Sequence, residues 1–188
     1  WVAATASPSS GDEQITISRG NNVTFSNTIL NIDQTVVEAG GTLTLTGPNV
    51  TINDGTGTDL TVNGTVNLNG SLSQNTGSSI SVNSGGSFVF NSGMLNGDGS
   101  VAIQSGGTFS FAGTGTMNLA GTKTFNNGGT IAWSSASSLL NFSGGSITVN
   151  NNANIDISAN AAMNNGGNIA SSLTINNNST GIITKSGT

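Results

Sequence analysis

A short motif recurs along the chain and limits the fold more than any other feature. It consists of an apolar-x-apolar pair, a small polar turn that usually contains Gly-Gly, and a second apolar-x-apolar pair. The clearest copies span residues 82–90 and 103–111, with the sequences VNSGGSFVF and IQSGGTFSF. The residue before each turn serves as an anchor, and the anchors lie 20 to 26 residues apart: Ile17, Val37, Val62, Val82, Ile103, Phe125, Val149 and Ile175. A near-constant period of this length indicates a solenoid of stacked repeats.

Five of the repeats also carry a third apolar patch, which indicates three strands per coil. These patches lie at residues 29–32, 50–52, 94–95, 117–119 and 139–140. Apolar and polar residues alternate with a period of two, so one set of side chains points inward and the other outward. We therefore predict an all-β chain, a parallel β-helix (solenoid) of about eight coils with three short strands per coil. The repeats cover residues 15–188, and residues 1–14 are a leader or an N-terminal cap.

Antiparallel hairpins are the main competing fold, because Asn-Gly pairs occur at residues 63–64, 69–70, 96–97, 127–128 and 165–166. Such pairs favour two-residue hairpin turns. A sandwich of hairpins is not expected to repeat the same turn at the same offset through the chain. The repeat therefore favours the solenoid.

Charge and composition argue against several classes of function. Charged residues make up only 6% of the chain and the net charge is −5. The positive residues are Arg19, Lys123 and Lys185, which are too scattered to form a phosphate-binding or headgroup-binding surface. No apolar run approaches the roughly 20 residues of a membrane-spanning helix. We therefore expect no nucleic-acid partner and no direct membrane insertion.

Alignment of the repeats predicts columns of equivalent side chains along the stack. Phe88, Phe109 and Ile131 are expected in one inward column, with Phe90, Phe111 and Trp133 beside it. The residue after the anchor is Asn in five coils, which predicts an outer column of stacked amides: Asn63, Asn83, Asn126, Asn150 and Asn176. The glycine pairs at residues 40–41, 85–86, 106–107 and 128–129 are expected to supply positive φ angles at the corners.

No enzyme chemistry is expected. The chain has no His and no Cys, which removes the usual transition-metal ligands and thiol or Ser-His catalysis. Its eight acids are dispersed. Asp54 and Asp59 lie on one extended loop and could approach each other. This pair could hold Ca²⁺ weakly together with loop carbonyls, although solvated surface carboxylates are the simpler interpretation. No cofactor is expected apart from that calcium ion.

Threonine is the one outward residue that suggests a specific ligand. Thr16, Thr61, Thr124, Thr148 and Thr174 occupy the outward position of the first strand. Flat threonine arrays bind ice in some solenoids, so ice binding remains an alternative. Paired Thr columns are complete only at Thr42, Thr44 and Thr46. Threonine is also a good outward strand residue, which is the simpler explanation.

The repeat style resembles that of large bacterial surface proteins. Residues 62–70 (VNGTVNLNG) and 80–88 (ISVNSGGSF) look like the repeats of autotransporter passenger regions. They are also similar to filamentous-haemagglutinin-like adhesins and to the Gly/Asn/Thr-rich surface proteins of Bacteroidetes. The resemblance implies a right-handed parallel β-helix, secretion to an extracellular or cell-surface location, a stalk or adhesin role, and host or environmental glycans as partners. It carries over no functional residue.

Both ends of the repeat region suggest further contacts. Trp1 and Val2 are the apolar residues able to cover the first coil. At the other end, residues 182–188 stop within a coil, so its strand edges would be open to another chain. The expected partners are therefore further repeats of the same chain or other copies of it. We expect a structural or adhesive surface module first, a self-assembling extracellular filament subunit second and an ice-binding solenoid third, with a carbohydrate-active enzyme last.

Overall fold

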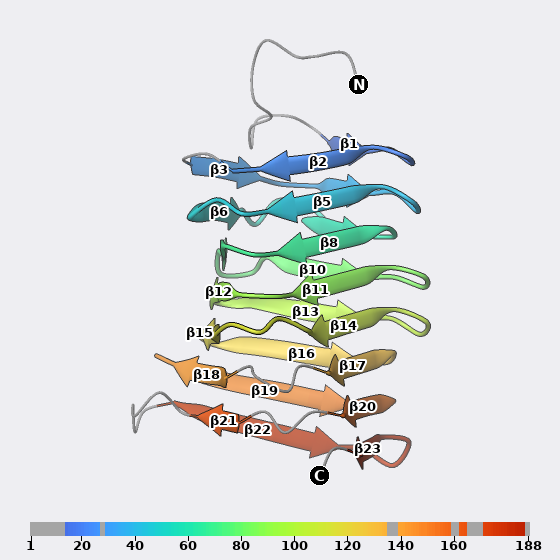
Figure 1. Cartoon of the computed structure of the whole chain (residues 1–188), viewed down its shortest axis with the longest axis vertical. Helices are drawn as coiled ribbons and strands as arrows, with labels where there is room; N and C mark the ends of the chain where they lie inside the picture. Colours follow the sequence, from blue (N-terminus) through green and yellow to red (C-terminus); the bar gives the residue numbers. More distant parts are fainter. Residues whose placement is uncertain (1–13, 27–28, 135–138, 159–161, 165–170, 187–188) are drawn as a thin grey trace.

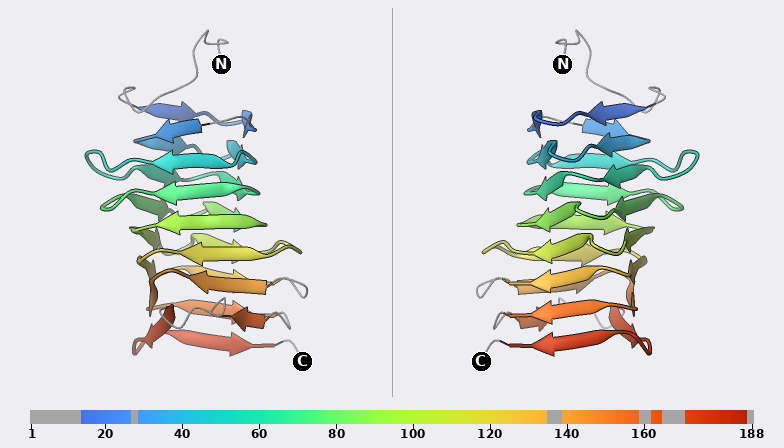
Figure 2. Two further views of the ribbon diagram at one scale, coloured as in Figure 1. Left: turned by 90° about the vertical axis from the view of Figure 1, so that its left-hand side faces the viewer. Right: turned by 90° about the vertical axis from the view of Figure 1, so that its right-hand side faces the viewer.

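The chain folds as a stack of parallel β-coils. A computed structural model describes residues 14–26, 29–134, 139–158, 162–164 and 171–186, and these residues form 23 strands without any helix. The coils follow one another from the N-terminus to the C-terminus along a single axis, as Figure 1 shows. Views turned by 90° show the same stack from its two sides (Figure 2). The predicted parallel β-helix with three strands per coil is confirmed.

Three parallel sheets run along the stack, and each coil contributes one strand to each of them in turn. Sheet A has eight strands: β1 (Ile15–Ile17), β4 (Thr35–Val37), β7 (Leu60–Val62), β10 (Ser79–Val82), β13 (Gly99–Ile103), β16 (Lys123–Asn127), β19 (Ser146–Asn151) and β22 (Ser172–Asn177). Sheet B also has eight: β2 (Asn22–Phe25), β5 (Thr42–Leu45), β8 (Thr65–Leu68), β11 (Ser87–Phe90), β14 (Thr108–Phe111), β17 (Thr130–Trp133), β20 (Asn154–Ile157) and β23 (Ile182–Lys185). Sheet C has seven: β3 (Ile29–Ile32), β6 (Asn49–Ile52), β9 (Ser71–Gln74), β12 (Gly93–Gly97), β15 (Met117–Ala120), β18 (Leu139–Ser143) and β21 (Ala162–Asn164).

Sequence alternation explains why these short segments become strands. In β5, β8 and β11 the buried residues alternate with half-buried ones along the strand. A single strand of this kind cannot pair its backbone groups or bury its apolar side, but the coils above and below supply both. Two strands of sheet C, β9 and β21, were not revealed by the apolar patches. In β9 the sequence SLSQ has only one apolar residue, Leu72, and β21 is only three residues long.

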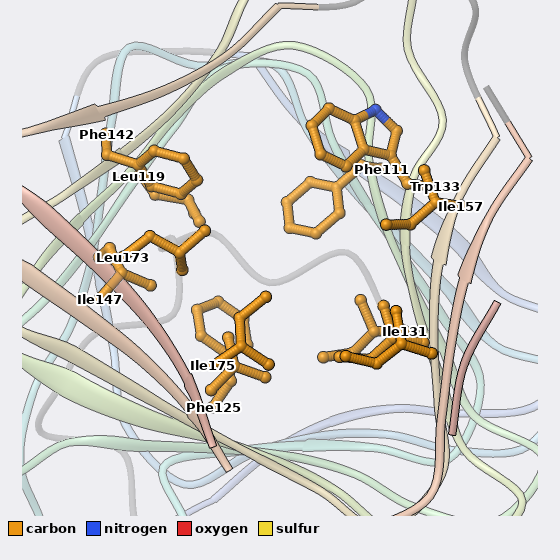
Figure 3. Close-up of a pocket in the computed structure, with 13 residues that line it drawn as sticks. Phe111, Leu119, Phe125, Ile131, Trp133, Phe142, Ile147, Ile157, Leu173 and Ile175 are labelled. Atoms are coloured by element: carbon orange, nitrogen blue, oxygen red, sulfur yellow. The ribbon is translucent and has the colours of Figure 1, made fainter. Parts of the chain in front are cut away.

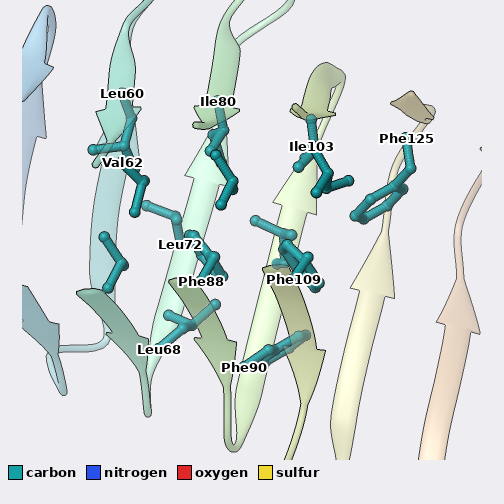
Figure 4. Packing of buried hydrophobic residues seen from close by; sticks show 14 of the residues in the cluster. Leu60, Val62, Leu68, Leu72, Ile80, Phe88, Phe90, Ile103, Phe109 and Phe125 are labelled. Carbon is teal, nitrogen blue, oxygen red and sulfur yellow. The ribbon is translucent and has the colours of Figure 1, made fainter. Parts of the chain in front are cut away.

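The interior is one continuous apolar column, with the rings packed where the sequence placed them. Phe88 pairs with Phe109 and Phe109 with Ile131, while Phe111 follows Phe90 and precedes Trp133. Phe88 and Phe109 stack with ring centroids 4.9 Å apart and 6° between their planes. Phe90 and Phe109 have no exposed surface. Figure 4 shows these rings between the strands of facing sheets, beside aliphatic residues such as Leu68.

Phe125 occupies a different position in sheet A from the one that the repeat alignment predicted. Its ring meets that of Phe109 edge-on, with centroids 5.4 Å apart and planes at 83°. The alignment put Phe125 beside Ile103, but the structure pairs it with Val101 and puts Asn127 beside Ile103. The predicted register at this coil is therefore wrong by two residues. A shift of two keeps the same face of the strand pointing inward, and it brings the polar side chain of Asn127 into the inward position beside Ile103.

Corner length is the cause of this register shift. The corner between the first and second strands has four residues after Ile103 but only two, Gly128 and Gly129, after Asn127. Glycine geometry follows corner length, because the four-residue corners place Gly40, Gly85 and Gly106 at φ near 80°. Gly128 and Gly129 have no positive φ, so that part of the prediction is wrong.

Where a corner ends in glycine directly before the next strand, as at Gly86 and Gly129, that glycine is needed for a different reason, which is close approach between coils. A Cβ atom at Gly86 would collide with the carbonyl oxygen of Val62 in the preceding coil, and one at Gly129 would collide with that of Gln104. The absence of a side chain lets the corners stack at the spacing of the strands.

Candidate functional site

The outer amide column exists in two separate pieces. Asn83 Nδ2 donates to Asn63 Oδ1 at 2.9 Å. Further along the stack, Asn150 Nδ2 donates to Asn126 Oδ1 and Asn176 Nδ2 donates to Asn150 Oδ1, both at 2.9 Å. The predicted single column is wrong, because the register shift brings Asn126 beside Ala102 rather than beside Gln104 at the corner. These amides lie on the outside of sheet A.

A second amide ladder, which sequence reasoning missed, lies inside the coils. Asn127 Nδ2 donates to Asn151 Oδ1, and Asn151 Nδ2 donates to Asn177 Oδ1, each at 2.7 Å. Asn127 and Asn151 have no exposed surface. They occupy the inward position that Ile103 holds one coil earlier. The available signal was the doubled Asn at residues 126–127, 150–151 and 176–177.

Lys123 is a buried cation that the sequence did not point to. It faces inward from β16 with 1% of its surface exposed. Its Nζ donates to Gln74 Oε1 at 2.9 Å and to the carbonyl oxygens of Asn96 and Gly97 at 3.1 and 2.9 Å. Three acceptors therefore match the three protons of the ammonium group. Burial lowers the pKa of Lys123 to about 8, opposed by the negative charge of Asp98.

Gly99 leaves room for the Lys123 side chain inside the coils. Gly99 pairs with Lys123 in sheet A and leaves open the inward position above it. The amine can therefore reach Gln74, which is two coils earlier in the stack. Gln74 is itself fixed, because its Nε2 donates to the carbonyl oxygens of Ser78 and Ser100 at 3.4 and 3.1 Å. The result is a buried polar node at the corner between sheets C and A.

The carboxylates of the extended loop are arranged differently from the predicted calcium pair. Asp59 is fully buried, and its oxygens accept the backbone amides of Gly55 and Ser79 at 2.9 and 2.7 Å. Its acidic partner is Asp33, to which it is hydrogen bonded. Burial raises the pKa of Asp33, and the hydrogen bond and charge of Asp59 and the charge of Asp54 raise it further.

This arrangement suits a structural role for Asp59, as an acceptor that closes the loop before β7. A calcium ion would have to displace backbone donors from Asp59, and it needs six to eight oxygen ligands. Within the described ranges, no group of three or more potential metal-binding side chains is placed to hold an ion.

Hydroxyl-bearing residues form one column on each of two outer faces. Along sheet B the column is Thr42, Thr65, Ser87, Thr108 and Thr130, as the strand registers show. Along sheet A it is Ser79, Ser100, Thr124, Thr148 and Thr174. The sequence alignment put Thr124 beside Ala102, so the sheet A column is more regular than predicted.

The second Thr column that an ice-binding face needs is incomplete. On sheet B the column beside Thr44 continues as Asn67, Val89, Ser110 and Ala132. Thr46 does not extend the array, because it lies beyond β5 and its hydroxyl donates to the carbonyl oxygen of Phe25 at 3.0 Å.

The interior of the stack opens at its C-terminal end. An apolar hollow of about 60 Å³ there is lined by residues that include Trp133, Leu173, Ile175 and Ile183 (Figure 3). Ile175 and Ile183 are 38% and 45% exposed, whereas their column neighbours Val149 and Ile155 are buried. The proposed cap residues Trp1 and Val2 lie outside the described residues.

The chain matches no protein-family model, no curated protein and no solved structure in the comparisons made. Among the residues described, no helix is long and apolar enough to cross a membrane.

The two amide ladders predict different responses to Ala substitution. Asn151→Ala removes a buried amide between two partners, and we expect a loss of about 2 kcal/mol in the free energy of unfolding. Asn150→Ala, the matched outer change, is expected to alter it by no more than about 0.5 kcal/mol. Urea unfolding followed by circular dichroism measures both. Equal effects would contradict the distinction between inner and outer ladders.

The lowered pKa of Lys123 predicts that the folded chain becomes more stable at alkaline pH. Its pKa is lower in the folded chain than in the unfolded chain, so the unfolded state binds more protons between pH 8 and 10.5. The free energy of unfolding should therefore increase through that range, by at most about 3 kcal/mol. Lys123→Met should lack this component of the pH profile. If both proteins gave the same profile in urea titrations, the three hydrogen bonds would fully compensate for the burial of the charge.

Proposed function

We propose that this chain is a structural and adhesive segment of an extracellular bacterial surface protein, a β-helical stalk or adhesin without catalysis. The observation that carries the proposal is the coil-to-coil pairing that runs through all three sheets around a single apolar core. Such a design gives length and stiffness from short repeats, because each coil is held by its neighbours.

The outer surface supports the same proposal. Its outward strand positions carry mostly Ser, Thr and Asn, for example Thr65, Ser87 and Thr108 on sheet B. Asp33 and Asp59 are hydrogen bonded to each other and not separated across a space that could hold a substrate bond. Catalysis by paired carboxylates would need such a space.

Protease accessibility on intact cells tests the surface location. Antibodies raised against the purified chain should label intact cells of the source bacterium. External protease should remove the label while leaving a cytoplasmic marker protein intact. Labelling only after lysis would overturn the proposal.

A second candidate, end-to-end assembly, is supported by the exposed apolar residues of β22 and β23. Ile183 points inward from β23, in the column of Ile155, yet it is 45% exposed. A further coil of the same kind would cover it and pair with β22 and β23.

Sedimentation velocity over a wide concentration range tests assembly. Self-association that Ile183→Lys abolishes, and that the outward control Thr184→Lys retains, is the expected result. A wild-type chain that stays monomeric throughout would overturn this candidate.

A further inference from the structure

A polar hollow lies on the outside of the corner between sheets C and A. It has a volume of about 550 Å³ and is lined by residues from the coils of β9, β12, β15 and β18. That volume lies within the usual range for small-molecule and glycan-sized sites. At this corner Gly97 and Gly121 both adopt φ of 82°, and Gly144 adopts 69°. The corner therefore carries few long side chains, which is why a hollow forms there.

The lining chemistry restricts the ligand. Amides come from Asn75 and Asn96, hydroxyls from Thr76 and Ser143, and one carboxylate from Asp98. Gln74 also borders the hollow, but its amide is buried and is already bonded to Lys123, Ser78 and Ser100. Among the described residues, the lining includes no aromatic ring and no cationic side chain. An anionic ligand would meet the carboxylate without a basic partner, and a large apolar ligand would leave the amides without hydrogen bonds. A neutral ligand rich in hydroxyl groups satisfies both restrictions.

The wall of the hollow is held rigid from inside by Lys123. Its ammonium group binds the side chain of Gln74 and the carbonyl oxygens of Asn96 and Gly97, so three lining residues are fixed by one buried group. Asp98 is also oriented, because its Oδ1 accepts the backbone amide of Thr122 at 2.6 Å. Fixed polar groups lose little conformational entropy when a ligand binds.

The hollow follows the stack axis. Asn75, Asn96, Ala120 and Ser143 come from four successive coils of sheet C, so the hollow spans roughly 14 Å at the usual strand spacing. An extended chain of several sugar units can lie along such a line and place successive hydroxyl groups beside the repeated polar groups.

We propose that this hollow binds a neutral glycan chain laid along the stack axis. The inference rests on the proposed adhesive function and names the ligand class and the place of contact. Lys123 acts as a positioning residue, since it touches the wall from inside.

The experiment titrates neutral cello-, chito-, malto- and xylo-oligosaccharides into ¹⁵N-labelled protein and follows the side-chain amide resonances. We expect saturable shifts at Asn75 and Asn96 for at least one series, with a Kd below about 1 mM. Ser143→Arg, which fills the hollow, should weaken binding at least tenfold. Ser87→Arg, the same change on sheet B, should not. Asn96→Ala removes one amide but keeps the backbone carbonyl that Lys123 binds, and should weaken binding several-fold. Circular dichroism would verify that each variant is folded.

The outcomes separate this inference from the proposed function. Absence of binding to every neutral series, or binding only to anionic glycans, would overturn the hollow as a neutral-glycan site while leaving a stalk role intact. Binding that Ser143→Arg leaves unchanged would place glycan adhesion elsewhere on the chain and would also overturn the inference. A chain that binds glycan in the hollow but is found only inside cells would overturn the surface role alone.

Discussion

Hydrogen bonding between the backbones of successive coils is the constraint on which the rest of the structure depends. Every strand of the three sheets pairs in parallel with the strand one coil away. This pairing fixes the spacing of the coils, and that spacing decides which side chains meet. Phe88 and Phe109 can stack at 4.9 Å because the backbone holds equivalent positions at about that distance. The aromatic core is therefore a consequence of strand register as much as of hydrophobicity.

Polar residues inside the coils obey the same constraint. A buried amide has no water partner, so it must find one in the coil above or below. Asn127 and Asn151 meet this requirement by repeating at equivalent inward positions, so that each amide binds the next. Lys123 has no such repeat, and its position under Gly99 allows it to reach acceptors across two coils instead. The asparagines are satisfied because the same side chain repeats from coil to coil. Lys123 is satisfied because Gly99 lacks a side chain at the equivalent position one coil earlier.

The sequence was sufficient for the architecture and for most of the core, because alternation and period report directly on which residues point inward. It was insufficient where corner length changed. The anchor rule assumed a four-residue corner, and the two-residue corner after Asn127 moved the register by two. Alternation cannot detect this error, since a shift of two leaves the inward set on the same face. The inner Asn ladder and the Lys123 node were missed for the same reason, because both depend on which coil lies above.

Asp33 and Lys123, the two groups with shifted pKa values, do not stabilise the fold near neutral pH. The pKa of Asp33 is raised, so its contribution to the free energy of unfolding falls as pH rises above the usual carboxyl pKa of about 3.9. The pKa of Lys123 is lowered, so its contribution recovers only as pH rises above about 8. Near neutral pH both groups therefore oppose folding. With only 3 positive and 8 negative side chains in the whole chain, stability must come mainly from apolar burial and coil-to-coil hydrogen bonds. These interactions depend little on salt or on moderate changes in pH, which suits the proposed role outside the cell, where neither is controlled.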